Sequence, residues 1–212
     1  MKQNTKCGTV CRPGGLALTA RMVKLCGFKE GGHIADIGCG SGTTMHYLKD
    51  KFNIKGIEID EQKAHTAQLD GLDVQCVSAE QMPFADSEMD GLLFECSFSK
   101  MEQPSLVLTE AKRVLKPNGK IAFSDFYAKN QPHQFENLLG RCDTLQMWHT
   151  LLDDAGFDVI TTEDYSNLLP QMWAQLKEEQ GGDEVYAKLG VTKEKLKQIK
   201  CGYCMIIAQK RG

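Results

Sequence analysis

The sequence predicts an α/β protein with a doubly wound, mainly parallel seven-stranded sheet, helices on both faces and a small helical cap. Short apolar runs alternate with amphipathic segments along most of the chain. A turn with glycine at every second position, residues 38–42, follows the first apolar run and leads into two threonines that can begin a helix. Strands that alternate with helices form βαβ units, which build parallel sheets covered on both faces.

Residues 1–28 are expected to form a polar N-terminal arm followed by a helix. The arm ends in the turn Pro13-Gly14-Gly15, and apolar residues then recur at helical spacing over residues 16–27. Gly27 stops this pattern, as glycine commonly does directly after a helix. The arm and helix therefore precede the first strand of the sheet.

Five strands are expected in the next hundred residues, each bounded by turn residues. They are residues 33–37, 54–59, 73–77, 91–95 and 120–125, and the helices among them are 43–51, 61–69 and 104–115. Asp60 is placed to cap the second of these helices, because aspartate accepts hydrogen bonds from free N–H groups at a helix start. Pro117 and Gly119 end the third helix.

The regular alternation of strands and helices ends after Asp125. Segments 127–150 and 166–200 are polar, aromatic and helical, and they are predicted to form the cap over the carboxyl edge of the sheet. A helix at 143–155 and strands at 157–162 and 203–208 complete the expected elements. No repeat or linker divides the chain, so residues 1–212 are interpreted as a single domain.

The composition and charge of the chain argue against several classes of function. The net charge is −3 and the isoelectric point is about 6.0, which argues against a nucleic-acid partner. The sequence has no apolar run long enough to cross a membrane and no apolar signal segment at its start, so we expect a cytoplasmic protein without a membrane partner. Nine cysteines, an odd number, indicate reduced thiols rather than a disulfide framework. The oligomeric state is left open.

Five motifs occur in a fixed order along residues 30–126. They are Asp36–Gly42, Gly56–Asp60, Ser78–Phe84, Asp90–Phe94 and Arg113–Gly119. In this order and spacing they resemble the class I S-adenosylmethionine-dependent methyltransferases, and most closely the subgroup that methylates small molecules. The rival nicotinamide-binding turn, Gly-x-Gly-x-x-Gly, requires a third glycine where this chain has Thr43.

The resemblance implies S-adenosylmethionine as cofactor and a small-molecule acceptor that receives the methyl group by in-line displacement. The glycine turn would meet the methionyl part of the cofactor, Glu58 the ribose hydroxyls, and Ala79 and Glu80 the adenine. The implied cofactor-binding residues are Asp36, Gly38, Cys39, Gly40, Glu58, Ile59, Ala79, Glu80 and Glu95. In the arm, Arg12 is a candidate partner for the cofactor carboxylate.

Acceptor-binding candidates cluster after the fourth and fifth strands. They are Ser97, Phe98, Ser99, Lys100, Asp125, Tyr127 and His133. Tyr127 and His133 are candidate general bases, and no residue is assigned as catalytic. No metal site is expected. Two alternatives stay open: a non-catalytic S-adenosylmethionine-binding sensor or scaffold, and cysteine-assisted methylation of arsenite, for which Cys7, Cys11, Cys201 and Cys204 would supply thiolates.

Overall fold

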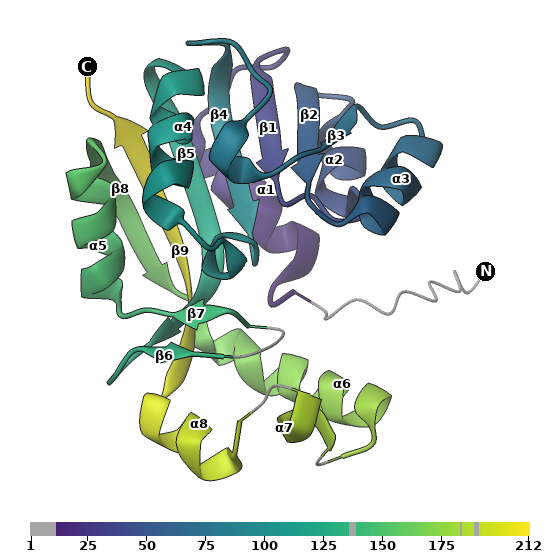
Figure 1. The fold of residues 1–212 in the computed structure, drawn as a ribbon, viewed down its shortest axis with the longest axis vertical. Helices are drawn as coiled ribbons and strands as arrows, with labels where there is room; N and C mark the ends of the chain where they lie inside the picture. The colour runs from purple at the N-terminus through teal and green to yellow at the C-terminus, as the bar shows by residue number, and fades with distance from the viewer. Residues whose placement is uncertain (1–11, 136–138, 183, 189–190) are drawn as a thin grey trace.

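A seven-stranded sheet forms the centre of the computed structural model, which describes residues 12–135, 139–182, 184–188 and 191–212 (Figure 1). The strand order is β3-β2-β1-β4-β5-β9-β8. The strands are β1 (His33–Ile37), β2 (Asn53–Glu58), β3 (Val74–Cys76), β4 (Met89–Glu95), β5 (Leu115–Ala128), β8 (Phe157–Asp164) and β9 (Cys201–Lys210). Two short strands, β6 (His133–Gln134) and β7 (Arg141–Cys142), pair antiparallel in a second, separate sheet.

The large sheet is mainly parallel, as predicted. Strands β1 to β5 pair only in parallel with one another, whereas β9 lies antiparallel to both of its neighbours, β5 and β8. The last strand in the sequence is therefore inserted between two strands that precede it. The order of the sheet reverses between β1 and β4, because β2 and β3 lie on one side of β1 and the later strands lie on the other.

The helices begin and end close to the expected positions. They are α1 (Gly15–Cys26), α2 (Thr43–Leu48), α3 (Glu61–Leu69), α4 (Pro104–Val114), α5 (Leu145–Asp154), α6 (Leu169–Gln180), α7 (Glu184–Lys188) and α8 (Lys193–Ile199), with 3₁₀ turns η1 (Ala79–Gln81), η2 (Phe98–Lys100) and η3 (Ser166–Leu168). Gly27 ends α1 at a φ of 65°, and the Asp60 carboxylate accepts the N–H groups of Gln62 and Lys63. Both predicted helix boundaries are thus confirmed.

Strand β4 shows why its sequence is apolar without alternation. Leu92 and Phe94 pack in one core cluster with residues of α4 and α5, whereas Leu93 packs in another with residues of α1. A strand buried on both faces has no polar side. The helices therefore cover both faces of the sheet, as predicted.

The expected cap segment 127–150 does not lie wholly in the cap. Its helical part, α5, lies beside β8 (Figure 1), and Trp148 packs against Phe98 and Phe123 with ring centroids 5.0 and 5.3 Å away. That part covers the sheet rather than its edge. The helices α6, α7 and α8 gather below the sheet in Figure 1 and form the helical cap.

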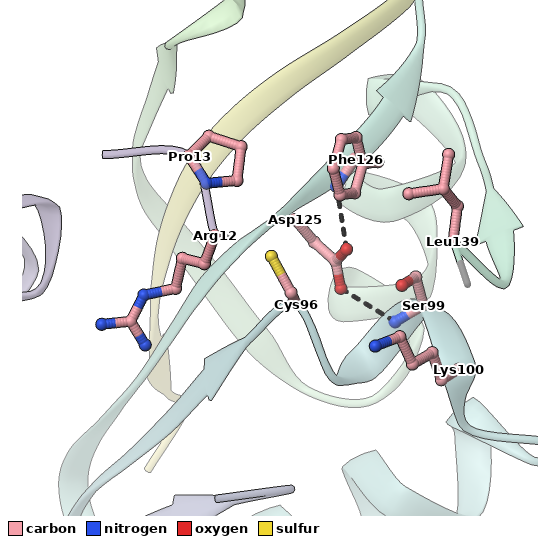
Figure 2. Close-up of a pocket in the computed structure, with 8 residues that line it drawn as sticks. All are labelled: Arg12, Pro13, Cys96, Ser99, Lys100, Asp125, Phe126 and Leu139. Carbon is pink, nitrogen blue, oxygen red and sulfur yellow. Dashed lines mark hydrogen bonds between the residues drawn. The ribbon is translucent and has the colours of Figure 1, made fainter. Parts of the chain in front are cut away.

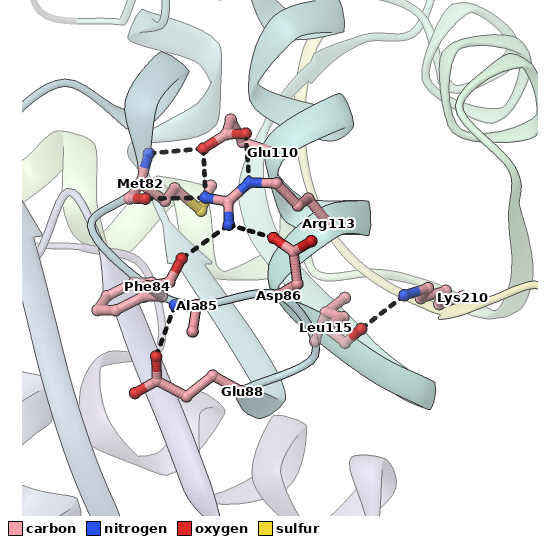
Figure 3. A network of polar contacts seen from close by, with 9 residues as sticks. All are labelled: Met82, Phe84, Ala85, Asp86, Glu88, Glu110, Arg113, Leu115 and Lys210. Carbon is pink, nitrogen blue, oxygen red and sulfur yellow. Dashed lines mark hydrogen bonds and ion pairs between the residues drawn. The ribbon is translucent and has the colours of Figure 1, made fainter.

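Arg113, at the end of α4, fastens the loop between η1 and β4 to that helix (Figure 3). Its guanidinium donates to the carbonyl oxygens of Met82 and Phe84 at 3.0 and 2.8 Å. It also donates to the carboxylates of Asp86 and Glu110. One side chain thereby holds the loop that follows η1.

Candidate functional site

The site lies where β1 and β4 end side by side, at the reversal of the strand order. Open α/β sheets bind their ligands at such a point, beyond the carboxyl ends of the strands. Here the Ser97 hydroxyl donates to the Ile37 carbonyl oxygen at 2.6 Å and joins the two strand ends. A Cβ at Gly38 would lie 2.5 Å from the Ser97 Cβ, so only glycine fits this junction.

The glycine turn follows β1 and leads into α2. Gly38, Gly40 and Gly42 all have positive φ values, of 75°, 57° and 84°, a region that glycine adopts without strain. A Cβ added at Gly42 would strike Leu72, but one at Gly40 would meet no atom within 4 Å. The backbone at Gly40 therefore borders open space on the side where a ligand would approach.

Glu58, at the end of β2, holds this turn from below. Its carboxylate accepts the Gly40 N–H at 2.7 Å and the Asp60 N–H at 3.0 Å. Glu58 is only 8% exposed, whereas Ile59 beside it is 71% exposed. Each carboxylate oxygen retains a second lone pair for a ligand hydroxyl. Ile59, which follows Glu58, therefore presents an exposed apolar side chain next to the glycine turn.

Asp36 and Cys39 flank the glycine turn from inside the protein. Asp36 is 3% exposed, and burial, with the neighbouring Glu95 charge, raises the pKa of its carboxyl group to about 8. The Cys39 thiol is half-buried, and its burial raises its pKa as well. Both groups are therefore protonated at neutral pH, because the interior disfavours their charged forms.

Glu95, at the end of β4, lies in a network that sequence reasoning missed. Its carboxylate accepts hydrogen bonds from Thr19 at 2.8 Å, from Thr44 at 2.5 Å and from Arg12 at 2.7 Å. Arg12 also donates to both threonine hydroxyls at 2.8 Å. The Glu95 side chain is 2% exposed. It joins the residues before α1, the helix α1 and the start of α2 to the centre of the sheet.

The expected adenine-side residues lie on the η1 turn. Ala79 is buried, and the Ser78 hydroxyl donates to the Glu80 carboxylate. The backbone N–H of Gln103, the residue before α4, also donates to the Glu80 carboxylate at 3.4 Å. The turn is thus held locally by Ser78 and against the start of α4.

A small pocket opens beside the ends of β4 and β5 (Figure 2). It is lined by Arg12, Pro13, Cys96, Ser99, Lys100, Asp125, Phe126 and Leu139. Three of these, Ser99, Lys100 and Asp125, were expected near the acceptor, whereas Cys96 and Leu139 were not singled out. Cys96 has a φ of 54°, and its thiol lies 3.1 Å from the Tyr203 hydroxyl. The strained backbone turns Cys96 toward the pocket.

Asp125 gives this pocket an acidic wall. It is completely buried and accepts the N–H groups of Ser99 and Phe126 at 2.9 and 2.8 Å. Burial raises the pKa of its carboxyl group, although both hydrogen bonds oppose the shift. The Ser99 hydroxyl is buried and has no hydrogen-bond partner among the residues that the structure describes. A polar ligand would find both groups at this wall.

The structure places the two candidate general bases away from the pocket lining. The Tyr127 ring lies against Gly202 and under the Lys129 amine, and burial raises the pKa of its hydroxyl. His133, the first residue of β6, stacks edge-on against Phe135, and burial lowers the pKa of its imidazole. Neither residue joins the group around Asp125.

Two of the four thiols considered for the arsenite alternative, Cys201 and Cys204, lie in the described residues and have different surroundings. Cys7 and Cys11 lie outside the described residues. Cys204 is buried, with its sulfur 3.6 Å from the Asp125 carbonyl oxygen, while the Cys201 sulfur contacts Cys142. In the described ranges no group of three or more His, Cys, Asp or Glu side chains is placed to hold a metal ion.

Comparison with known proteins indicates one type of domain over part of the chain. A model of the methyltransferase domain matches residues 35–123, which contain the glycine turn, Glu58, Glu95 and the pocket strand β4. Over these residues the chain is similar to the methyltransferase domain, and this match supports a class I S-adenosylmethionine-dependent methyltransferase. Methyltransferases of this class use S-adenosylmethionine as their cofactor, so S-adenosylmethionine is the ligand against which we compare the geometry of the glycine turn.

Curated relatives of this chain are named for diverse methyl-transfer activities. A sarcosine/dimethylglycine N-methyltransferase from Halorhodospira halochloris is 27% identical over 80% of this chain and 67% of its own length. The 24-methylenesterol C-methyltransferase 2 of Arabidopsis thaliana is 30% identical over 71% of this chain and 48% of its own. This methyltransferase thus spans about half to two thirds of these relatives.

Solved structures share the methyltransferase fold. The cyclase SpnF is 24% identical with a TM-score of 0.77, and the match covers 92% of this chain and 80% of SpnF. A phosphoethanolamine N-methyltransferase from Haemonchus contortus, in complex with S-adenosylhomocysteine, is 16% identical with a TM-score of 0.76 over 95% of this chain and 54% of its own. Since one neighbour is a cyclase, the fold of this methyltransferase does not by itself specify the reaction.

The described part of this methyltransferase has no helix long and apolar enough to cross a membrane. Sequence reasoning identified Glu58 and the glycine turn because they belong to local motifs. It missed Thr19 and Thr44, which are ordinary helix residues in the sequence. The one available signal was Arg12, which precedes the Pro-Gly-Gly turn and was considered for the cofactor carboxylate rather than for Glu95.

Proposed function

We propose that this chain transfers the methyl group of S-adenosylmethionine to a small-molecule acceptor bound beside Asp125. The observation that carries the proposal is the continuity of two sites through the end of β4. Glu95 lies behind the glycine turn and binds Arg12, and Arg12 and Cys96 line the polar pocket. A donor held at the turn and an acceptor held in the pocket would therefore lie on either side of one strand end.

The residues around the glycine turn fit S-adenosylmethionine. Gly40 presents backbone to open space, where a Cβ would meet no protein atom, and a sulfonium amino acid could approach it closely. Glu58 is a fixed, buried carboxylate with free lone pairs for two ribose hydroxyls. Ile59 offers an exposed apolar surface for a flat base.

The remaining roles in cofactor binding follow from position. The backbone of Gly38, Cys39 and Gly40 would surround the methionyl part, with Asp36 beneath it. Ala79 and Glu80 would border the adenine. Glu95 would act through Arg12, Thr19 and Thr44, which already use its carboxylate oxygens. It would shape the cofactor site from behind rather than bind the cofactor itself.

On the acceptor side, Asp125 and Ser99 are the groups that would orient a substrate. A carboxylate that lines a pocket can accept a hydrogen bond from an N–H or O–H group of the acceptor. The cofactor supplies an activated methyl group, so the protein's main contribution is to align the acceptor atom and exclude water. Arg12 and Lys100 add positive charge at the pocket wall.

The test combines binding and turnover on the same protein. Titration calorimetry with S-adenosylhomocysteine should show binding, and Glu58→Gln should weaken it at least about tenfold, since hydrogen bonds to charged groups contribute about 1.5–3 kcal/mol each. Glu61→Gln, an exposed acid at the start of α3, is the matched control and should bind normally. Equal affinity of Glu58→Gln and the wild type would contradict the ribose assignment.

Turnover is then followed as formation of S-adenosylhomocysteine with a panel of small amines, alcohols, thiols and carboxylic acids. Asp125→Asn should reduce methyl transfer while S-adenosylhomocysteine still binds. If the wild type binds the cofactor and methylates no acceptor of any class, the transfer proposal fails and a binding protein is supported instead. If it does not bind the cofactor, the whole proposal fails.

A further inference from the structure

Two thiols contact each other near the acceptor pocket, and the proposed methyl transfer uses neither of them. Cys142 is the second residue of β7, and Cys201 is the first residue of β9. Their sulfur atoms are 3.8 Å apart. Cys201 is fixed in register opposite Ala128 of β5, and Ala128 in turn bridges to Thr144, two residues after Cys142. The pair is therefore held together by the ends of three extended segments.

The two thiols differ in access. Cys142 is completely buried, whereas Cys201 is partly exposed. The hydrogen bond with Cys201, reinforced by burial, raises the pKa of the Cys142 thiol. Cys142 is thus kept as a protonated thiol for as long as Cys201 has not reacted. A reagent from solvent reaches Cys201 first, and the interaction that protects Cys142 ends once Cys201 has reacted.

We infer that Cys142 and Cys201 form a dithiol site that is reversibly oxidised to a disulfide by low-molecular-weight disulfides of the glutathione type. In the first step the Cys201 sulfur attacks the reagent disulfide, forms a mixed disulfide and releases one reagent thiol. In the second step the Cys142 sulfur attacks the Cys201 sulfur and releases the second thiol. Two protein thiols are oxidised, one reagent disulfide is reduced to two thiols, and the protons pass to the released thiols.

The movement required for this bond is small. A disulfide has its sulfurs about 2.05 Å apart, so the two atoms would approach by about 1.8 Å. Rotation of the partly exposed Cys201 side chain can supply part of that shift. Protein disulfides in reducing compartments are mostly transient or regulatory, which is the class to which this pair would belong.

The link would fix one wall of the acceptor pocket. Next to Cys142, Arg141 donates to the carbonyl oxygens of Phe98 and Met101 at 3.4 and 2.5 Å. A Cβ at Gly140 would lie 2.3 Å from the Ser99 carbonyl oxygen, so the backbone of this segment lies directly on η2. Oxidation would tie that segment to β9. The glycine turn is built from other elements and would keep its affinity for S-adenosylhomocysteine.

The alternative explanation is purely structural: two small thiols pack together, as buried cysteines often do. The test uses the full chain with glutathione disulfide as the oxidant, followed by alkylation of free thiols and tryptic mass spectrometry. Cleavage after Arg141 and Lys200 gives peptides that begin with the two cysteines. Cys204 shares the second peptide, so the Cys204→Ser variant is mapped in parallel. Cys76, an exposed thiol, reports that the oxidant has acted.

We expect a Cys142–Cys201 link in the wild type and in Cys204→Ser, and none in Cys142→Ser or Cys201→Ser. Oxidation should raise the Tm of the wild type by about 5–10 °C, because a cross-link restricts the unfolded chain. Dithiothreitol should reverse the shift, and both serine variants should show none. Affinity for S-adenosylhomocysteine should be the same before and after oxidation.

Three results would overturn the inference. One is glutathione remaining on Cys201 without transfer to Cys142 while Cys76 is modified. Another is both cysteines remaining free under those conditions. The third is a link that involves Cys204 instead of Cys142. None of these measurements depends on methyl transfer, so failure here is distinct from failure of the proposed function.

Discussion

Arg12 and Glu95 form an ion pair of 2.7 Å between residues 83 positions apart in the chain. The Glu95 side chain is 2% exposed and that of Arg12 is 18% exposed. Two charges taken out of water in this way depend on each other, because removal of one leaves the other unpaired in a poorly solvated place. The pair fastens the start of the described chain to the middle of the sheet.

Glu95→Gln should destabilise the protein by about 2–4 kcal/mol, since it leaves the Arg12 charge without its partner. Urea denaturation measures the change in the free energy of unfolding. Asp158→Asn is the control: its bond with Arg211 is also 2.7 Å long, but these side chains are 66% and 40% exposed. That variant should change stability by less than about 1 kcal/mol. Similar losses in both variants would mean that burial does not strengthen the Arg12 pair.

Gly38→Ala and Gly40→Ala separate the fold from the ligand site. At Gly38 a methyl group would clash with Ser97, so we expect a loss of about 2–4 kcal/mol in unfolding free energy. At Gly40 only the positive φ is penalised, which costs about 1–2 kcal/mol. Gly40→Ala should nevertheless weaken binding of S-adenosylhomocysteine at least about tenfold in calorimetry, because the methyl group enters the ligand's space. Normal binding by Gly40→Ala would place the cofactor elsewhere.

Asp36 should make the protein less stable as the pH rises. Its folded-state pKa of about 8 lies above the unfolded value of about 3.9, so the folded state binds the extra proton between these limits. The contribution is complete below the unfolded pKa and is lost as the pH rises toward 8, at up to about 1.4 kcal/mol per pH unit. Asp36→Asn should remove this slope. Urea denaturation at pH 5, 6 and 7 checks the difference, and parallel curves for the two proteins would contradict it.

Arg113→Lys should cost about 1–3 kcal/mol, because a lysine cannot serve two carbonyl oxygens and two carboxylates at once. Arg21→Lys is the matched change at the exposed pair with Glu163, and it should cost less than about 0.5 kcal/mol. Thermal unfolding of both variants gives the comparison. An equal shift in Tm would show that the loop after η1 does not depend on Arg113.

The sheet, and the glycine turn that Glu58 holds, were predictable because their signals are local. Apolar runs of strand length, the glycine turn and the acid at Glu58 each occupy a few consecutive residues, and the helix starts and stops at Asp60 and Gly27 follow from single residues. The packing of α5 was not predicted in the same way. Its polar and aromatic surroundings indicated a cap, but Trp148 packs with Phe98 and Phe123 in the main core.

Contacts between distant residues account for most of what the sequence did not indicate. Nothing near Thr19 or Thr44 indicates that both hydroxyls donate to Glu95. Tyr127 and Asp125 lie two positions apart on one strand, and both were reasonable candidates for the acceptor site. Asp125 lines the pocket, while Tyr127 is directed to the surroundings of Gly202. Which neighbour reaches a site depends on packing across the sheet and not on local pattern.

The antiparallel strand β9 has a consequence for the order of synthesis on the ribosome. Strands β1 to β5 can pair as soon as they emerge, but β5 and β8 are separated in the sheet by β9, which is made after both. Until residues 201–210 leave the exit tunnel, β5 exposes an unpaired edge of buried residues. Such edges promote association between nascent chains. This half of the sheet is therefore the part that would need protection by a chaperone during translation.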